Sequence, residues 1–150
     1  MISIEELKVD NKMEVSFYSI SENERLARVI AATFATRLDP TIEEINDIKT
    51  AVSEAVTNAI VHGYEHNKGN VIMKLAALNR QLYIEVSDKG CGIENVNEAR
   101  KPLFTTKPDE ERSGMGFVFM EVFMDEIEVI SKVHDGTIVK MMKTIGKQEI

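Results

Sequence analysis

Two polar side chains spaced one helical turn apart, Glu54 and Asn58, are of the types that phosphate chemistry needs. Because they are four residues apart in a helical pattern, they lie on the same side of the predicted helix, off its apolar stripe. A carboxylate can orient or accept a hydroxyl proton, and an amide oxygen is a suitable ligand for Mg²⁺. The spacing favours a shared role at one reacting phosphate, although a solvated helix face has the same pattern.

Two glycine turns are further candidates for ligand binding. Asp88-Lys89-Gly90-Cys91-Gly92 follows an alternating run, and its glycines would let the backbone approach a flat ligand closely. Its carboxylate could accept a hydrogen bond from an exocyclic amine, which adenine has. Ser113-Gly114-Met115-Gly116 opens an apolar helix, whose first N–H groups and dipole suit a phosphate. Each turn by itself is also typical of an ordinary glycine turn, and the sequence has no P-loop motif.

The helix that must carry the Glu and Asn pair is marked at both ends. Thr41-x-x-Glu44 is a capping box at its start, and Gly63 is expected to end it. Apolar residues at helical spacing predict its buried stripe: Ile45, Ile48, Val52, Ala55, Val56, Ala59 and Ile60.

An earlier helix is predicted by the same signals. Ser21-x-x-Glu24 is a capping box, and Asp39-Pro40 breaks the helix. Its predicted buried stripe is Leu26, Val29, Ile30, Phe34 and Leu38.

The remaining elements are short strands joined by turns. Alternation predicts about five strands, over 13–20, 71–78, 81–88, 127–133 and 138–142, and an apolar helix over 116–124. Asn79-Arg80 and His134-Asp135-Gly136 join two strand pairs as hairpins. We therefore expect one domain over 1–150 with a polar lead-in at 1–12. The predicted fold class is a two-layer α/β sandwich, with a mixed, mostly antiparallel sheet and helices on one face.

Residues 93–113 form a long polar connection, interrupted by Pro102 and Pro108, without a sustained apolar period. Connections of this length in a small domain are usually functional, so we predict a lid over the ligand. Lys107 and Arg112 lie in this lid and could pair with phosphate charge; solvated charges are the alternative.

The composition excludes several classes of function. The 150 residues carry a net charge of −7, which disfavours direct binding to nucleic acid. Cys91 is the single cysteine, so no internal disulfide is possible, and the three histidines lack metal-ligand spacing. His62 is interpreted as a surface histidine near a helix end. Neither a signal peptide nor an apolar run of membrane-spanning length is evident, so we expect a cytoplasmic protein.

The order of these motifs resembles the GHKL ATPase/kinase superfamily, which shares the Bergerat nucleotide fold, over nearly all of the chain. Within it, the chain is most similar to the bacterial anti-sigma factor serine kinases, particularly their sporulation branch. The residue runs that carry this resemblance are SEAVTNAIVHGY at 53–64, PLFTTKP at 102–108, RSGMGF at 112–117 and FMDE at 123–126.

The resemblance implies a role for each matching residue, with ATP and Mg²⁺ as cofactors. Glu54 would be the general base, Asn58 the Mg²⁺ ligand and Asp88 the adenine ligand. Thr137 would help Asp88 hold adenine through water. The glycines Gly90, Gly92, Gly114 and Gly116 would let the backbone close around the nucleotide. The lid residues expected to contact it are Thr105, Lys107, Arg112 and Ser113.

The resemblance also implies the partners. The protein would be a homodimer that holds a sigma factor inactive and phosphorylates a serine of its anti-anti-sigma antagonist. Arg28 lies off the apolar stripe of its predicted helix, and we expect it to contact the sigma factor, since Arg is favoured at interfaces.

Alternative functions share the same nucleotide site. One alternative is an anti-sigma kinase of the general stress response, and only the resemblance of the sequence separates it from the sporulation kinases. A histidine-kinase catalytic domain would need a dimerising helix with a phosphoacceptor histidine, and none is predicted before Met13. An ATP-driven clamp would need further domains, and the intact Glu54 argues against a binding module without catalysis.

Overall fold

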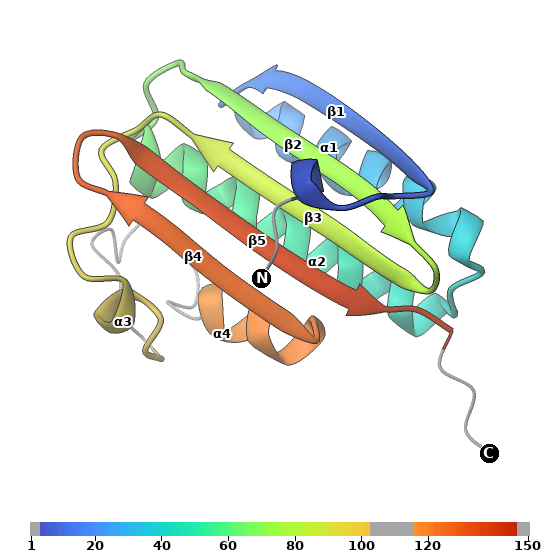
Figure 1. Cartoon of the computed structure of the whole chain (residues 1–150). Coiled ribbons are helices and arrows are strands. Elements are labelled where there is room, and N and C mark those ends of the chain that lie inside the picture. Colours follow the sequence, from blue (N-terminus) through green and yellow to red (C-terminus); the bar gives the residue numbers. More distant parts are fainter. Residues whose placement is uncertain (1–3, 103–115, 147–150) are drawn as a thin grey trace.

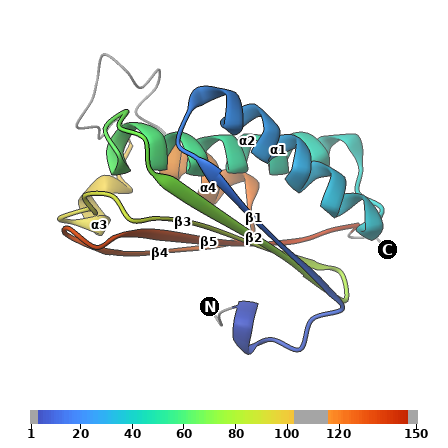
Figure 2. The same ribbon diagram turned by 90° about the horizontal axis from the view of Figure 1, so that it is seen from above.

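The computed structural model describes residues 4–102 and 116–146, which form a helical layer on one face of a five-stranded sheet (Figures 1 and 2). All neighbouring strands pair antiparallel, in the order β1-β2-β3-β5-β4. The strands are β1 (Asn11–Tyr18), β2 (Asn70–Leu78), β3 (Gln81–Asp88), β4 (Glu126–Lys132) and β5 (Gly136–Thr144). The predicted two-layer fold class is confirmed, with a wholly antiparallel sheet among the described strands.

Helix α2 (Ile42–Asn58) lies along the centre of the helical layer (Figure 1). The predicted capping box is confirmed: the Glu44 N–H donates to the Thr41 hydroxyl at 3.1 Å, and the Thr41 N–H donates to the Glu44 carboxylate at 2.9 Å. Its stripe packs into the main core, where Ile48, Val52 and Val56 are fully buried. Burial of this stripe fixes the rotation of the helix about its axis and hence the direction of its polar side chains.

Helix α1 (Ser21–Ala35) differs from its prediction at the start. Ile20 is the N-cap residue and provides no side-chain cap, so the predicted capping box at Ser21 is wrong. Glu24 instead accepts a hydrogen bond from the Ser53 hydroxyl of α2. A contact between two helices therefore replaces the local contact that the motif predicts.

The predicted buried stripe of α1 is also partly wrong. Leu26 and Val29 are 58% and 52% exposed, whereas Phe34 is buried as predicted. The face that packs toward α2 and the sheet is made mainly of alanines: Ala27, Ala31 and Ala35. Small side chains let two helices approach closely, so packing favours the alanine face over the larger residues.

The other face of the sheet carries the N-terminal turn η1 (Ile4–Glu6) (Figure 2). Ile4 is buried, and its N–H donates to the Glu85 carboxylate at 3.3 Å. Glu5 pairs with Lys74 of β2 at 2.5 Å. In the described part of the chain, no helix has the length and apolarity needed to span a membrane.

Candidate functional site

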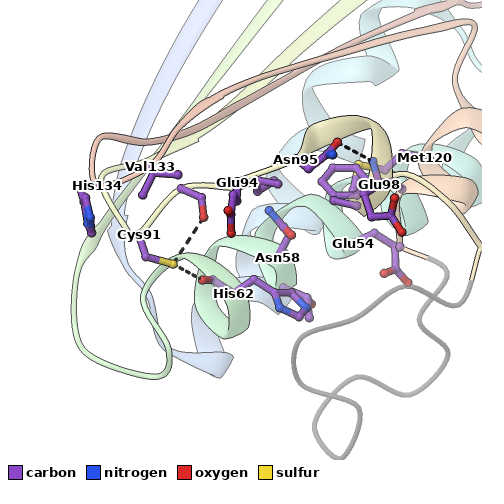
Figure 3. A pocket seen from close by; sticks show the side chains of 16 residues that line it. Glu54, Asn58, His62, Cys91, Glu94, Asn95, Glu98, Met120, Val133 and His134 are labelled. Atoms are coloured by element: carbon purple, nitrogen blue, oxygen red, sulfur yellow. Dashed lines mark hydrogen bonds between the residues drawn. The ribbon is translucent and has the colours of Figure 1, made fainter.

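A cavity of about 920 Å³ opens between the C-terminal half of α2, the loop after β3 and the start of α4 (Gly116–Phe123) (Figure 3). Such a volume lies within the range of nucleotide-sized ligand sites. Glu54 and Asn58 both line it, as their spacing predicts. Phe117 and Met120 of α4 supply apolar surface.

Beyond Asn58, helix α2 continues as the π-helical turn η3 (Ala59–Gly63), which ends at the glycine predicted to end the helix. Single π turns inside helices occur frequently at functional sites. The half-buried side chain of His62 lies on this turn and lines the cavity (Figure 3), where the sequence favoured a surface position.

The loop of residues 88–92 packs against this π turn without room for a side chain at Gly90. A Cβ on Gly90 would lie 2.1 Å from the Gly63 carbonyl oxygen. The Cys91 N–H donates to the same oxygen at 2.9 Å. The Tyr64 hydroxyl accepts the Lys89 N–H at 2.7 Å and donates to the carbonyl of Asn70 at 2.6 Å. The sequence analysis did not predict that Tyr64 contacts this loop, because no local motif links the two.

The same loop contacts the β4–β5 hairpin on its other side. A Cβ on Gly92, whose φ is +77°, would lie 2.2 Å from the Lys132 carbonyl oxygen. A Cβ on Gly136 would lie 2.0 Å from the Asp88 carbonyl oxygen. The His134 N–H donates to the Cys91 carbonyl at 2.7 Å. In this structure the glycines permit close contact between backbone and backbone.

Asp88 and Thr137 are 5% and 3% exposed, and neither is among the described residues that line the cavity. The Asp88 carboxylate accepts the backbone N–H groups of Gly90, at 2.8 Å, and of Thr137. Burial raises the pKa of Asp88, and these two donors partly oppose that effect. The two predicted adenine ligands are therefore adjacent and buried beside the cavity.

Ser131 of β4 joins this buried group to the cavity wall. Its hydroxyl accepts the Ile93 N–H at 2.7 Å and lies 2.8 Å from the Thr137 hydroxyl. The sequence analysis missed Ser131; its position opposite Thr137 in the hairpin is the one available signal.

Several predicted residues cannot be placed relative to this site. Thr105, Lys107, Arg112, Ser113 and Gly114 lie outside the described residues, so their roles stay predictions. Gly116 is described and lines the cavity.

Arg28 lies on α1 and is absent from the cavity lining; its guanidinium is 3.9 Å from Glu24. Its predicted contact with a sigma factor stays a prediction.

Among the described residues, the candidate protein ligand for a metal ion at this site is the amide of Asn58. Within 4–102 and 116–146, no three His, Cys, Asp or Glu side chains are grouped to hold one. The Asn58 amide in the cavity wall fits Mg²⁺, which commonly takes one or two protein ligands together with substrate phosphates and water.

Comparison with known proteins agrees with this geometry. Residues 19–143 match the family model of the histidine kinase-like ATPase domain. The chain is 54% identical over 141 residues to a protein of Caldanaerobacter subterraneus subsp. tengcongensis named Anti-sigma F factor, covering 94% of this chain and 99% of the relative. It is 58% identical over 136 residues to the Anti-sigma F factor of Clostridium acetobutylicum, covering 90% and 94%.

Among solved structures, the fold is similar to that of the RsbU and RsbW domains of a Mycobacterium tuberculosis protein, with a TM-score of 0.66 and 18% identity. The match covers 92% of this chain and 33% of the other, and it supports the fold. The resemblance predicted from the sequence is confirmed by these comparisons.

Proposed function

The chain belongs to the histidine kinase-like ATPase family, and from this premise we propose that it is an anti-sigma factor with protein serine kinase activity. It binds and inhibits the sporulation sigma factor sigma F, and it uses ATP to phosphorylate a serine of the anti-anti-sigma antagonist. The two relatives named Anti-sigma F factor that were compared above, which match 94% and 90% of this chain, support the choice of partner. A sigma factor as partner implies action in the cytoplasm, and the active unit is a homodimer.

One observation carries the kinase assignment: Glu54 and Asn58 line a single cavity of about 920 Å³ together with Gly116, the first residue of α4. A helix start offers unpaired N–H groups to phosphate oxygens. In the proposed complex, Glu54 and Asn58 lie next to the phosphate chain of the nucleotide. The adenine base of the nucleotide lies toward the loop of residues 88–92.

The proposed mechanism is transfer of the γ-phosphoryl group to a serine hydroxyl. Glu54 orients the hydroxyl and accepts its proton as the oxygen attacks. Asn58 would hold Mg²⁺ through its amide oxygen, and the ion would neutralise charge on the phosphates. The apolar side chains of Phe117 and Met120 limit access of water to this end of the cavity.

The test is phosphoryl transfer from γ-labelled ATP to a purified anti-anti-sigma protein in the presence of Mg²⁺. Glu54→Gln is compared with Glu43→Gln, a control on an exposed position of the same helix. Loss of general-base catalysis should lower the rate of transfer about 10²- to 10⁴-fold. Binding of ATP should persist in Glu54→Gln, and Glu43→Gln should behave as wild type.

Label on a serine of the antagonist, lost selectively in Glu54→Gln, would support the proposal. Wild-type protein that binds ATP and sigma factor without transferring phosphate would be an ATP-gated binding module, and the kinase assignment would be wrong.

A further inference from the structure

We propose that Ser131 is a positioning residue that makes the site selective for adenine, by holding the Thr137 hydroxyl as a hydrogen-bond acceptor. The inference rests on the proposed function and on the role that the sequence resemblance implies for Thr137 and Asp88, which is to hold the adenine amine. Ser131 itself is not among the described residues that line the cavity.

The position of Ser131 follows from strand pairing. It lies in the edge strand β4, directly opposite Thr137 of β5. Its side chain is half-buried, whereas that of Thr137 is 3% exposed. Thr137 pairs on its other side with Asp88 of β3, so the three residues form one row across three strands.

The Ser131 hydroxyl has three neighbours within hydrogen-bond distance. They are the Ile93 N–H at 2.7 Å, the Thr137 hydroxyl at 2.8 Å and the Gly136 carbonyl at 3.1 Å. A hydroxyl offers one proton and two lone pairs. The Ile93 N–H takes one lone pair of the Ser131 oxygen, because an N–H group can only donate. The Gly136 carbonyl needs the proton, because a carbonyl only accepts.

One arrangement of protons satisfies all three contacts. Ser131 donates to Gly136 and accepts from both Ile93 and Thr137. If Ser131 donated to Thr137 instead, its contact with the Gly136 carbonyl would be lost. In a half-buried group, the arrangement that satisfies every polar atom is favoured. The proton of Thr137 is therefore committed to Ser131, and Thr137 presents only lone pairs in other directions.

This orientation has a chemical consequence for the base. Adenine carries an amine donor where guanine carries a carbonyl acceptor. An ionised Asp88 and an oriented Thr137 both accept, directly or through water, so they match the adenine amine and oppose the guanine carbonyl. Without Ser131, the Thr137 proton becomes free to turn toward the base, and the site can donate to guanine.

The Ile93 contact links this row to the cavity. Ile93 follows Gly92 and lines the cavity, and its N–H is held by Ser131 from behind. A substitution at Ser131 therefore changes the orientation of Thr137 and the support of the cavity wall together.

The experiment measures dissociation constants for Mg²⁺-ATP and Mg²⁺-GTP in wild type and Ser131→Ala. We expect the preference for ATP over GTP to fall about tenfold in Ser131→Ala. Ser131→Thr keeps a hydroxyl and should keep the wild-type preference. The matched control is Ser16→Ala, on the opposite edge strand β1, where the hydroxyl donates to the Asn70 side chain at 2.9 Å.

A double-mutant cycle with Thr137→Val separates positioning from a general structural effect. Thr137→Val should lower the preference for ATP, and adding Ser131→Ala should then change it no further. Should Ser131→Ala fail to fold, Ser131→Cys takes its place, because a thiol is a weak donor and acceptor and should also lower the preference for ATP. An unchanged preference in Ser131→Ala, or a loss of thermal stability with the preference intact, would overturn the inference. Wild-type protein that binds neither nucleotide would remove the proposed function as well.

Discussion

At one end of the cavity, the loop of residues 88–92 is held between the π turn of α2 and the β4–β5 hairpin. At the other end, Glu54 and Asn58 project from a single helix. The loop end depends on backbone contacts so close that Gly90, Gly92 and Gly136 have no room for a Cβ. The helix end depends on half-buried side chains whose helix is already stabilised by its opposite face.

The two ends of the cavity should therefore respond differently to mutation. At the loop end, the proposed recognition of the base would use the same contacts as folding, so substitutions should change both. At the helix end, the side chains can be changed while the core stripe of α2 stays intact, so the proposed chemistry should be lost and the fold kept.

A large loss of stability is expected for Gly90→Ala. Its Cβ would collide with the backbone of Gly63, which cannot move without displacing the end of α2. Overpacking of this kind costs about 3 kcal/mol of unfolding free energy, measured by urea denaturation. Asn58→Ala is the control at the other end and should change it by less than about 1 kcal/mol. Equal losses in the two variants would contradict the comparison.

A smaller loss of stability and a selective loss of binding are expected for Gly63→Ala. Its Cβ would lie 2.9 Å from the Asp88 carboxylate, a side chain that can rotate away. Stability should fall by about 1 kcal/mol, while the affinity for ATP falls about tenfold because Asp88 is displaced. Calorimetric titration with ATP and urea denaturation of the same sample separate the two quantities. An unchanged affinity of Gly63→Ala for ATP would show that Asp88 does not recognise the base.

Tyr64→Phe tests one hydrogen-bonded anchor of the loop. The hydroxyl that joins the Lys89 N–H to the Asn70 carbonyl is lost, and the ring remains. We expect a loss of about 1 kcal/mol and faster hydrogen exchange at the amides of the loop. Tyr83→Phe is the matched control, since the Tyr83 hydroxyl donates to the Gln81 side chain within its own strand. Similar exchange in the two variants would show that Tyr64 does not anchor the loop.

The smallest effect expected is the pH dependence caused by Asp88. Burial raises its pKa from the ordinary value of 3.8, so the folded state holds this proton more strongly than the unfolded state does. The stability that Asp88 contributes is greatest below its ordinary pKa and falls as the pH rises through the raised one. The difference in unfolding free energy between wild type and Asp88→Asn should therefore decrease with pH across that window. A difference that increased with pH would mean that the pKa is lowered instead.

Local signals predicted most of the fold. The capping box at Thr41, the hairpin turn at Asn79-Arg80 and the period of α2 all depend on residues within about four positions of one another. The same signals failed at Ser21 and at Leu26, where contacts with α2 and the sheet decide the outcome. An amphipathic pattern predicts that a helix buries a face, and packing decides which face.

Spacing along the chain was enough to place Glu54 and Asn58 on one side of a helix, because the helical period is a local property of the chain. The way the loop of residues 88–92 is held depends on long-range contacts, because Gly63 and Gly90, or Ile93 and Ser131, are far apart in sequence. Contacts of this kind leave no local pattern. They form when the sheet and the helix bring distant backbone segments within hydrogen-bond distance.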